Sequence, residues 1–180
     1  MDLTKEFTMR VFVTGATGFI GSAVVRELLD AGHHVTGLAR SEEAAASLEA
    51  VGADVRRGSL EDPDSLRGGA ATADGVIHTA YIHDFSATGN PAAAAQTDGR
   101  AIEALGSALE GSGKPLVVAS GIVRVEGRAS TEEDAAPENP DFPRVSEPWR
   151  SRWPSAACAS RWCGCRRRCT ARATTRSSRR

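Results

Sequence analysis

A glycine-rich turn between an expected strand and an expected helix constrains this chain more than any other feature. Residues 9–14 read Met-Arg-Val-Phe-Val-Thr, a short β-rich run, and residues 15–21 read Gly-Ala-Thr-Gly-Phe-Ile-Gly. Apolar side chains then recur at helical spacing over residues 20–29, and Ala31-Gly32 ends that pattern. A strand, a glycine turn and a helix in direct succession predict a unit that binds a dinucleotide at the turn.

The three glycines of this turn have separate expected roles. Gly15 permits the tight turn, Gly18 lets the backbone approach a pyrophosphate, and Gly21 allows the helix to pack closely on the strand. The N-terminus of the helix offers unpaired N–H groups and a partial positive charge to phosphate oxygens. The turn therefore supplies the first predicted cofactor-binding residues, which are Gly15, Ala16, Thr17, Gly18, Phe19, Ile20 and Gly21.

The chain that follows alternates between strand and helix patterns. Further strands are expected at residues 34–38, 55–57, 75–79 and 115–120, and helices at residues 42–50, 62–67 and 92–109. This alternation predicts an α/β fold with a parallel sheet that helices cover on both faces. We expect a Rossmann-like, doubly wound sheet that is C-terminally incomplete, because no ordered pattern follows residue 147.

The composition changes abruptly after Glu147. Up to this residue the chain holds all 23 acidic residues and 12 Lys and Arg, whereas residues 148–180 hold 10 Arg, every Cys and Trp, and no acidic residue. The predicted organisation is therefore an N-terminal extension at residues 1–8, a dinucleotide-binding domain at residues 9–147, and a basic Arg/Cys tail at residues 148–180. The tail shows neither helical nor strand periodicity, so we expect it to be disordered.

The composition of this tail allows two interpretations. Cysteines 158, 163, 165 and 169 among arginines would suit a zinc knuckle or a nucleic-acid arm, but their spacing matches no strong zinc pattern. We therefore predict no metal site and no nucleic-acid partner. The favoured interpretation is a one-base deletion near the Glu147 codon, because the shifted frame of a GC-rich gene, with suitable bases at the wobble positions, can yield a string with helical and then strand periodicity.

Four segments resemble the extended and atypical short-chain dehydrogenase/reductases, which include the NAD-dependent epimerase/dehydratases. They are the turn at residues 15–21, Gly-Ser-Leu-Glu-Asp at 58–62, Asp-Gly-Val-Ile-His-Thr-Ala at 74–80, and Val-Val-Ala-Ser at 117–120. The resemblance covers residue 9 to about residue 147. It implies that Ser59, Leu60, Ala80 and Tyr81 line the cofactor, and that Ser120 orients a substrate oxygen as a catalytic residue.

The end of the second expected strand bears on the choice of cofactor. An acidic residue there would bond the ribose 2′-hydroxyl of NAD and repel a 2′-phosphate. This chain has Arg40 and Ser41 instead. Because a guanidinium pairs with phosphate bidentately and a hydroxyl can donate to it, NADP(H) is favoured over NAD(H).

The sequence lacks the catalytic dyad that the resemblance leads one to expect. The resemblance implies a Tyr-x-x-x-Lys dyad, but residues 142–147 read Phe-Pro-Arg-Val-Ser-Glu, and the only tyrosine is Tyr81. An arginine such as Arg144 cannot readily act as a general base in its place. Two functions stay open: an NAD(P)-dependent oxidoreductase or epimerase/dehydratase-like enzyme that is truncated, and a non-catalytic NADP(H)-binding sensor.

The histidines divide by their expected place in the sheet. His78 lies inside a buried strand and is interpreted as a core histidine, whereas His83 and Asp84 follow the carboxyl end of that strand, where ligands bind in open α/β sheets. His33 and His34 are expected at the opposite edge of the sheet, where the strands begin. The chain shows neither a signal peptide nor a long apolar run, so we expect a cytoplasmic location and no membrane contact. The expected partner is a small-molecule substrate, and self-association is left open.

Overall fold

The computed structural model describes residues 8–83, 91–119 and 127–129. Its parallel sheet has the strand order β3-β2-β1-β4-β5. The strands are β1 (Arg10–Thr14), β2 (His34–Ala39), β3 (Asp54–Arg57), β4 (Gly75–His78) and β5 (Leu116–Val118). The helices are α1 (Phe19–Asp30), α2 (Glu42–Ala50), α3 (Pro63–Thr72) and α5 (Pro91–Leu109). This order confirms the predicted Rossmann-like, doubly wound α/β fold.

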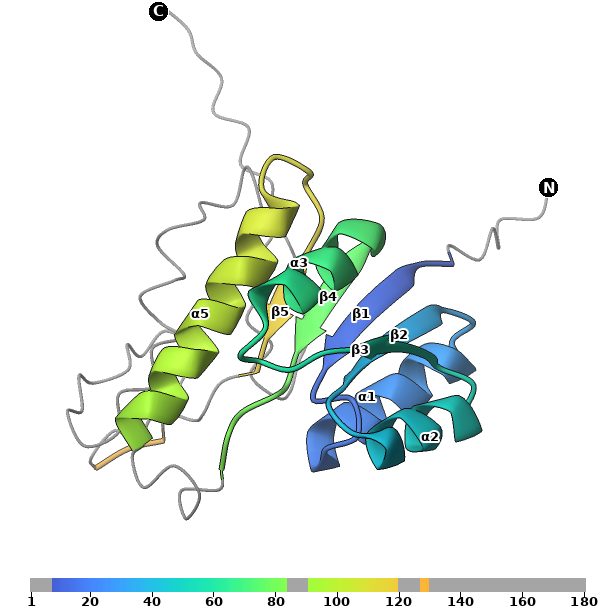
Figure 1. Ribbon diagram of the computed structural model, residues 1–180, viewed down its shortest axis with the longest axis horizontal. Helices are drawn as coiled ribbons and strands as arrows, with labels where there is room; N and C mark the ends of the chain where they lie inside the picture. Colours follow the sequence, from blue (N-terminus) through green and yellow to red (C-terminus); the bar gives the residue numbers. More distant parts are fainter. Residues whose placement is uncertain (1–7, 84–90, 120–126, 130–180) are drawn as a thin grey trace, which may run out of the picture.

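Helices cover both faces of the sheet (Figure 1), with α1 and α2 on one face and α3 and α5 on the other. The side chains of β1 alternate between the two layers, as a buried parallel strand requires. Val11 and Val13 pack in the cluster with α1 and α2, whereas Phe12 packs in the cluster with α3 and α5. None of the described helices has the length and apolar content needed to cross a membrane.

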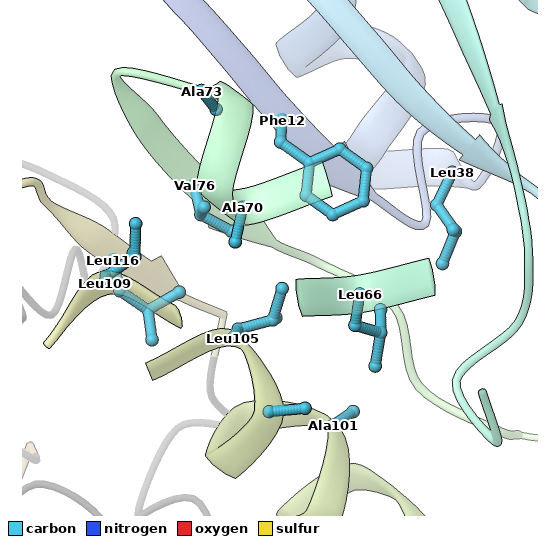
Figure 2. Packing of buried hydrophobic residues seen from close by; sticks show 11 residues of the cluster. Phe12, Leu38, Leu66, Ala70, Ala73, Val76, Ala101, Leu105, Leu109 and Leu116 are labelled. Atoms are coloured by element: carbon cyan, nitrogen blue, oxygen red, sulfur yellow. The ribbon is translucent and has the colours of Figure 1, made fainter. Parts of the chain in front are cut away.

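The core beneath α3 and α5 is centred on the ring of Phe12 (Figure 2), which is fully buried together with Leu66 of α3 and Leu105 of α5. Helix α3 is longer than predicted, since it continues past residue 67 to Thr72. Two glycines, Gly68 and Gly69, follow the predicted end. In the fold, however, a Cβ at Gly69 would lie 2.4 Å from Cζ of Phe12, so the missing side chain makes room for the ring.

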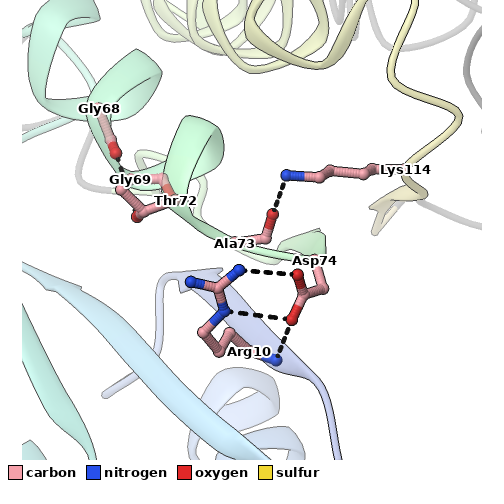
Figure 3. Close-up of polar contacts among 7 residues, drawn as sticks. All are labelled: Arg10, Gly68, Gly69, Thr72, Ala73, Asp74 and Lys114. Carbon is pink, nitrogen blue, oxygen red and sulfur yellow. Dashed lines mark hydrogen bonds and ion pairs between the residues drawn. The ribbon is translucent and has the colours of Figure 1, made fainter.

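A group of polar contacts closes the edge of the sheet where the strands begin (Figure 3). The guanidinium of Arg10 donates to both carboxylate oxygens of Asp74, at 3.0 and 3.2 Å, and its backbone N–H donates to the same carboxylate at 2.9 Å. These hydrogen bonds, led by the one from the side chain, lower the pKa of Asp74 to about 2. Nearby, the ammonium of Lys114 donates to the carbonyl of Ala73 at 2.7 Å.

Candidate functional site

A cleft of about 760 Å³ lies at the opposite edge, where the strands end. Its volume falls within the range of about 300–1,000 Å³ that small-molecule sites span. The cleft brings together twelve of the thirteen predicted cofactor-binding residues, which are Gly15, Thr17, Gly18, Phe19, Ile20, Gly21, Arg40, Ser41, Ser59, Leu60, Ala80 and Tyr81. Ala16 does not line it, because its side chain is 1% exposed and packs under the turn with Val13 and Val25.

The glycine turn leaves no room for side chains at two of its positions. Gly15 has φ +68°, and a Cβ there would lie 2.6 Å from the backbone nitrogen of Ala80. A Cβ at Gly21 would lie 2.0 Å from the carbonyl oxygen of Gly15, so the first turn of α1 rests directly on the loop. Gly18 closes the turn by donating its N–H to that same oxygen at 2.9 Å. The turn is therefore compact, and at its three glycines it presents only backbone to the cleft.

The start of α1 is suited to an anion. Its N-cap is Gly18, which provides no side-chain cap, and its first turn contains no acidic residue. The first N–H groups of a helix have no partner within the helix, and the helix dipole adds a partial positive charge to them. Phe19 is 97% and Ile20 56% exposed beside these groups. Ile20, one of the predicted cofactor-binding residues, lies in the first turn of α1 and lines the cleft.

The other end of the cleft is built from the ends of β2 and β3 and the first turns of α2. Arg40 follows β2 and is exposed, and its side chain makes no hydrogen bond or ion pair with another described residue. Ser41 caps α2 by accepting the N–H of Ala44 at 3.2 Å. Glu43 and Ser47 also line the cleft, which the sequence analysis missed. Their spacing of one helical turn is the signal that could have found them.

A buried polar chain lies beneath the turn. The Nδ1 atom of His78 lies 2.6 Å from the hydroxyl of Thr14, and its Nε2 atom lies 3.0 Å from a carboxylate oxygen of Asp98 in α5. All three side chains are buried. The interpretation of His78 as a core histidine with satisfied hydrogen bonds agrees with this geometry. Asp98 was not predicted, although an acidic residue on the alanine-rich apolar face of a helix is an unusual signal.

On the β4 side of the cleft, the rings of Tyr81 and His83 lie 5.0 Å apart at 58°. Both residues line the cleft, whereas His33 lies at the far edge and accepts the N–H of Met9 at 3.4 Å. Asp84, Ser120, Arg144 and the cysteine-rich tail fall outside the described residues. Over the described ranges, no group of three or more His, Cys, Asp or Glu could hold a metal ion.

Together, the strand order and the compact glycine turn at the carboxyl edge of β1 define a Rossmann-type dinucleotide-binding domain. The cradle of backbone and the uncapped helix start fit the pyrophosphate of a dinucleotide. Comparison with known families then places the chain: residues 11–147 match the NAD dependent epimerase/dehydratase family. The chain belongs to this family.

Individual relatives support this placement. The uncharacterised protein C2A9.02 of Schizosaccharomyces pombe is 50% identical over 138 residues, which cover 76% of this chain and 45% of that protein. A ketoreductase of Stigmatella aurantiaca, which acts on a 4-hydroxy-2-methyl-3-oxo-4-farnesyl-3,4-dihydroquinoline-1-oxide, is 40% identical over 80 residues, which cover 44% of this chain and 24% of the enzyme. The chain thus spans less than half the length of these relatives.

Among solved structures, the UDP-glucose-4-epimerase of Stenotrophomonas maltophila, crystallised with bound NAD and formylated UDP-arabinopyranose, has the same fold. The TM-score is 0.66 at 20% identity, and the match covers 80% of this chain and 47% of the epimerase. At this level of identity the similarity concerns the fold alone. It agrees with the parallel sheet and the helical layers described above.

Proposed function

We propose that this chain is the cofactor-binding part of an NADP(H)-dependent oxidoreductase of the epimerase/dehydratase family that acts on a small carbonyl compound or the matching alcohol. The observation that carries the proposal is Arg40, an exposed arginine directly after β2 at the rim of the cleft. The carboxyl end of β2 is where an acidic residue selects the ribose hydroxyls of NAD. A guanidinium at this place favours a 2′-phosphate instead.

The chemistry of the bound cofactor is hydride transfer at the nicotinamide ring. The residues of this chain contribute binding and orientation. The turn at residues 15–21 and the start of α1 hold the pyrophosphate, and Arg40 and Ser41 hold the adenosine end. The aromatic pair Tyr81 and His83 lines the cleft beyond β4. The similarity to a ketoreductase supports a carbonyl as the substrate class.

Cofactor titration tests this proposal. The fluorescence of NADPH and of NADH would be followed as each binds the full chain, and dissociation constants compared between wild type and Arg40→Ala. One charge-assisted hydrogen bond contributes about 1.5–3 kcal/mol, so the variant should bind NADPH at least about tenfold more weakly, with NADH unchanged. Arg67→Ala is the control, because Arg67 pairs with Asp64 on the surface of α3. Equal wild-type affinity for the two cofactors would contradict the proposal.

A non-catalytic NADP(H)-binding sensor is the second candidate. The observation in its favour is the absence of a Tyr-x-x-x-Lys pair from the sequence, in which Tyr81 is the only tyrosine and the fourth residue after it is Phe85. Oxidation of NADPH at 340 nm in the presence of a panel of ketones, aldehydes and sugars separates the two functions. Turnover of any member of the panel supports the enzyme, whereas tight cofactor binding without turnover supports the sensor.

We also propose that residues 148–180 are translated out of frame, so that the chain is a truncated form of a longer protein. The family match ends at residue 147, and the acidic residues end at the same position. Sequencing the gene across the Glu147 codon tests this. If one inserted base opens a long frame with helix and strand periodicity, the repaired protein is the one to assay for turnover. If no such frame continues, the proposal is wrong and the tail is a native segment.

A further inference from the structure

A second, shallower hollow of about 380 Å³ continues the cleft past the end of β2. It shares Arg40, Gly58 and Ser59 with the main cleft, and it adds Arg57, the last residue of β3. The remaining lining residues are Ala39, Glu42 and Asp62. The hollow therefore brings a second arginine to the part of the site where the proposed function places the adenosine end of the cofactor.

The register of the sheet explains why Arg57 reaches this place. Arg57 is the pairing partner of Ala39, so it ends β3 level with the residue that precedes Arg40. Gly58 then donates its N–H to the carbonyl of Ala39 at 3.1 Å, which fixes the chain just beyond the strand. Side chains alternate along a strand. The preceding Arg56 accordingly points to the other face, where its Nε donates to the carbonyl of Ser65 at 3.1 Å.

Arg57 is held by one partner that can be exchanged. A terminal nitrogen of its guanidinium forms an ion pair with Glu42 in the first turn of α2, and the two side chains are 47% and 91% exposed. Exposed pairs of this kind contribute little to stability. A guanidinium carries five N–H donors in a planar fork, so the contact with Glu42 leaves donors available. Phosphate, with two charges and three oxygens, is the stronger partner for such a group.

We infer that Arg57 is a second specificity-determining residue for the 2′-phosphate of NADP(H), and that Glu42 holds its guanidinium at the rim and competes with the phosphate for it. Arg40 and Arg57 then contact the phosphate from the ends of adjacent strands. When the phosphate enters, Arg57 exchanges its carboxylate partner for a phosphate oxygen. This inference rests on the proposed function, because it assumes a dinucleotide in the cleft.

The first test compares two pairs of ligands on the full chain by calorimetry: NADPH with NADH, and 2′-phospho-ADP-ribose with ADP-ribose. Arg57→Ala should weaken the phosphorylated member of each pair about tenfold and leave the other unchanged, because only the 2′-phosphate loses a charged donor. Arg67→Ala is the matched control, with a similarly exposed arginine in a surface ion pair outside both hollows. An Arg57→Ala variant that behaves like this control overturns the inference.

The role of Glu42 is tested by charge-neutral variants. Glu42→Gln should tighten binding of 2′-phospho-ADP-ribose a few-fold by releasing Arg57, and this gain should vanish in an Arg57→Ala background. Glu49→Gln controls for the loss of one negative charge, since Glu49 lies on the same helix, lines neither hollow and forms no ion pair with Arg57. Equal gains from both variants, or a gain that survives without Arg57, would show that Glu42 acts only through its general charge.

The same measurements separate the inference from the function on which it rests. If wild type prefers the phosphorylated ligands and Arg40→Ala abolishes that preference while Arg57→Ala does not, the NADP(H) assignment stands and only the role of Arg57 is refuted. If wild type binds both members of each pair equally, or binds neither, the proposed NADP(H) function fails and the inference falls with it.

Discussion

Two adjacent glycines of α3, Gly68 and Gly69, should respond differently to substitution by alanine. A Cβ added at Gly69 would lie 2.4, 2.5 and 2.7 Å from three ring atoms of Phe12. That ring is fully buried between α3 and the sheet, so it has nowhere to move. A Cβ added at Gly68 would instead lie 2.1 Å from a terminal nitrogen of Arg56, which is the flexible end of a long side chain.

The expected change in the free energy of unfolding of each variant follows from two opposing effects. Alanine in place of glycine inside a helix is favourable by about 1 kcal/mol, and this gain is common to both variants. Overpacking against a fixed core costs about 1–3 kcal/mol, and three close ring contacts place Gly69→Ala at the upper end, for a net loss of about 2 kcal/mol. For Gly68→Ala, the gain is offset by the weakened hydrogen bond from Arg56 to Ser65, which is worth about 0.5–1.5 kcal/mol.

Urea unfolding followed by circular dichroism at 222 nm measures both variants. We expect Gly68→Ala to lie within about 0.5 kcal/mol of wild type and Gly69→Ala to be less stable by about 2 kcal/mol, with the slope against urea unchanged. If Gly69→Ala were as stable as Gly68→Ala, the close packing of α3 on Phe12 would be wrong. A change of slope in either variant would instead indicate an altered unfolded state.

Two further predictions concern buried and edge carboxylates. Asp98→Leu leaves Nε2 of buried His78 without an acceptor and should lower the free energy of unfolding by about 1–3 kcal/mol, whereas Asp98→Asn keeps an acceptor and should lose less; equal losses would contradict the hydrogen-bond argument. The pKa of Asp74 is about 2 because of its bonds with Arg10, below the value of about 3.9 expected in the unfolded chain. Its stabilising effect is therefore complete above about pH 4 and is lost as the pH falls through 2, so the difference in urea midpoint between wild type and Asp74→Asn should be clearly smaller at pH 2.5 than at pH 5. A difference in urea midpoint that stays constant between these pH values would refute the role given to the Asp74 carboxylate.

The sequence predicted the elements whose signals are local. Residues 42–50 form α2 with both ends as expected, because Ser41 caps the start and Gly52 follows the end with φ +84°. The glycine turn could also be predicted from the sequence, because its glycines are required by the local backbone conformation. Helix α3 was predicted too short because its continuation depends on Phe12, a contact that no local pattern records.

In the candidate site, too, residues with a local sequence signal could be predicted, whereas residues that depend on tertiary contacts could not. Arg40 and Ser41 follow a strand end, and their position could be read from the chain. Asp98 could not be assigned a role, because its partner His78 lies on β4 and meets it only after α5 has packed on the sheet. Arg57 was missed for a related reason: β3 is a strand of four residues, too short for its alternation to show which arginine faces the cleft.

The central place of β1 has a consequence for how the chain assembles during synthesis. Its partner β2 follows after a single helix, but Thr14 and its other neighbour, His78 of β4, are 64 residues apart. At about 5–20 residues per second, roughly 3 to 13 seconds separate the synthesis of the two strands. During that interval Phe12 has no α5 to cover it. The nascent chain thus carries a half-paired strand with an exposed aromatic ring until the later elements have been made.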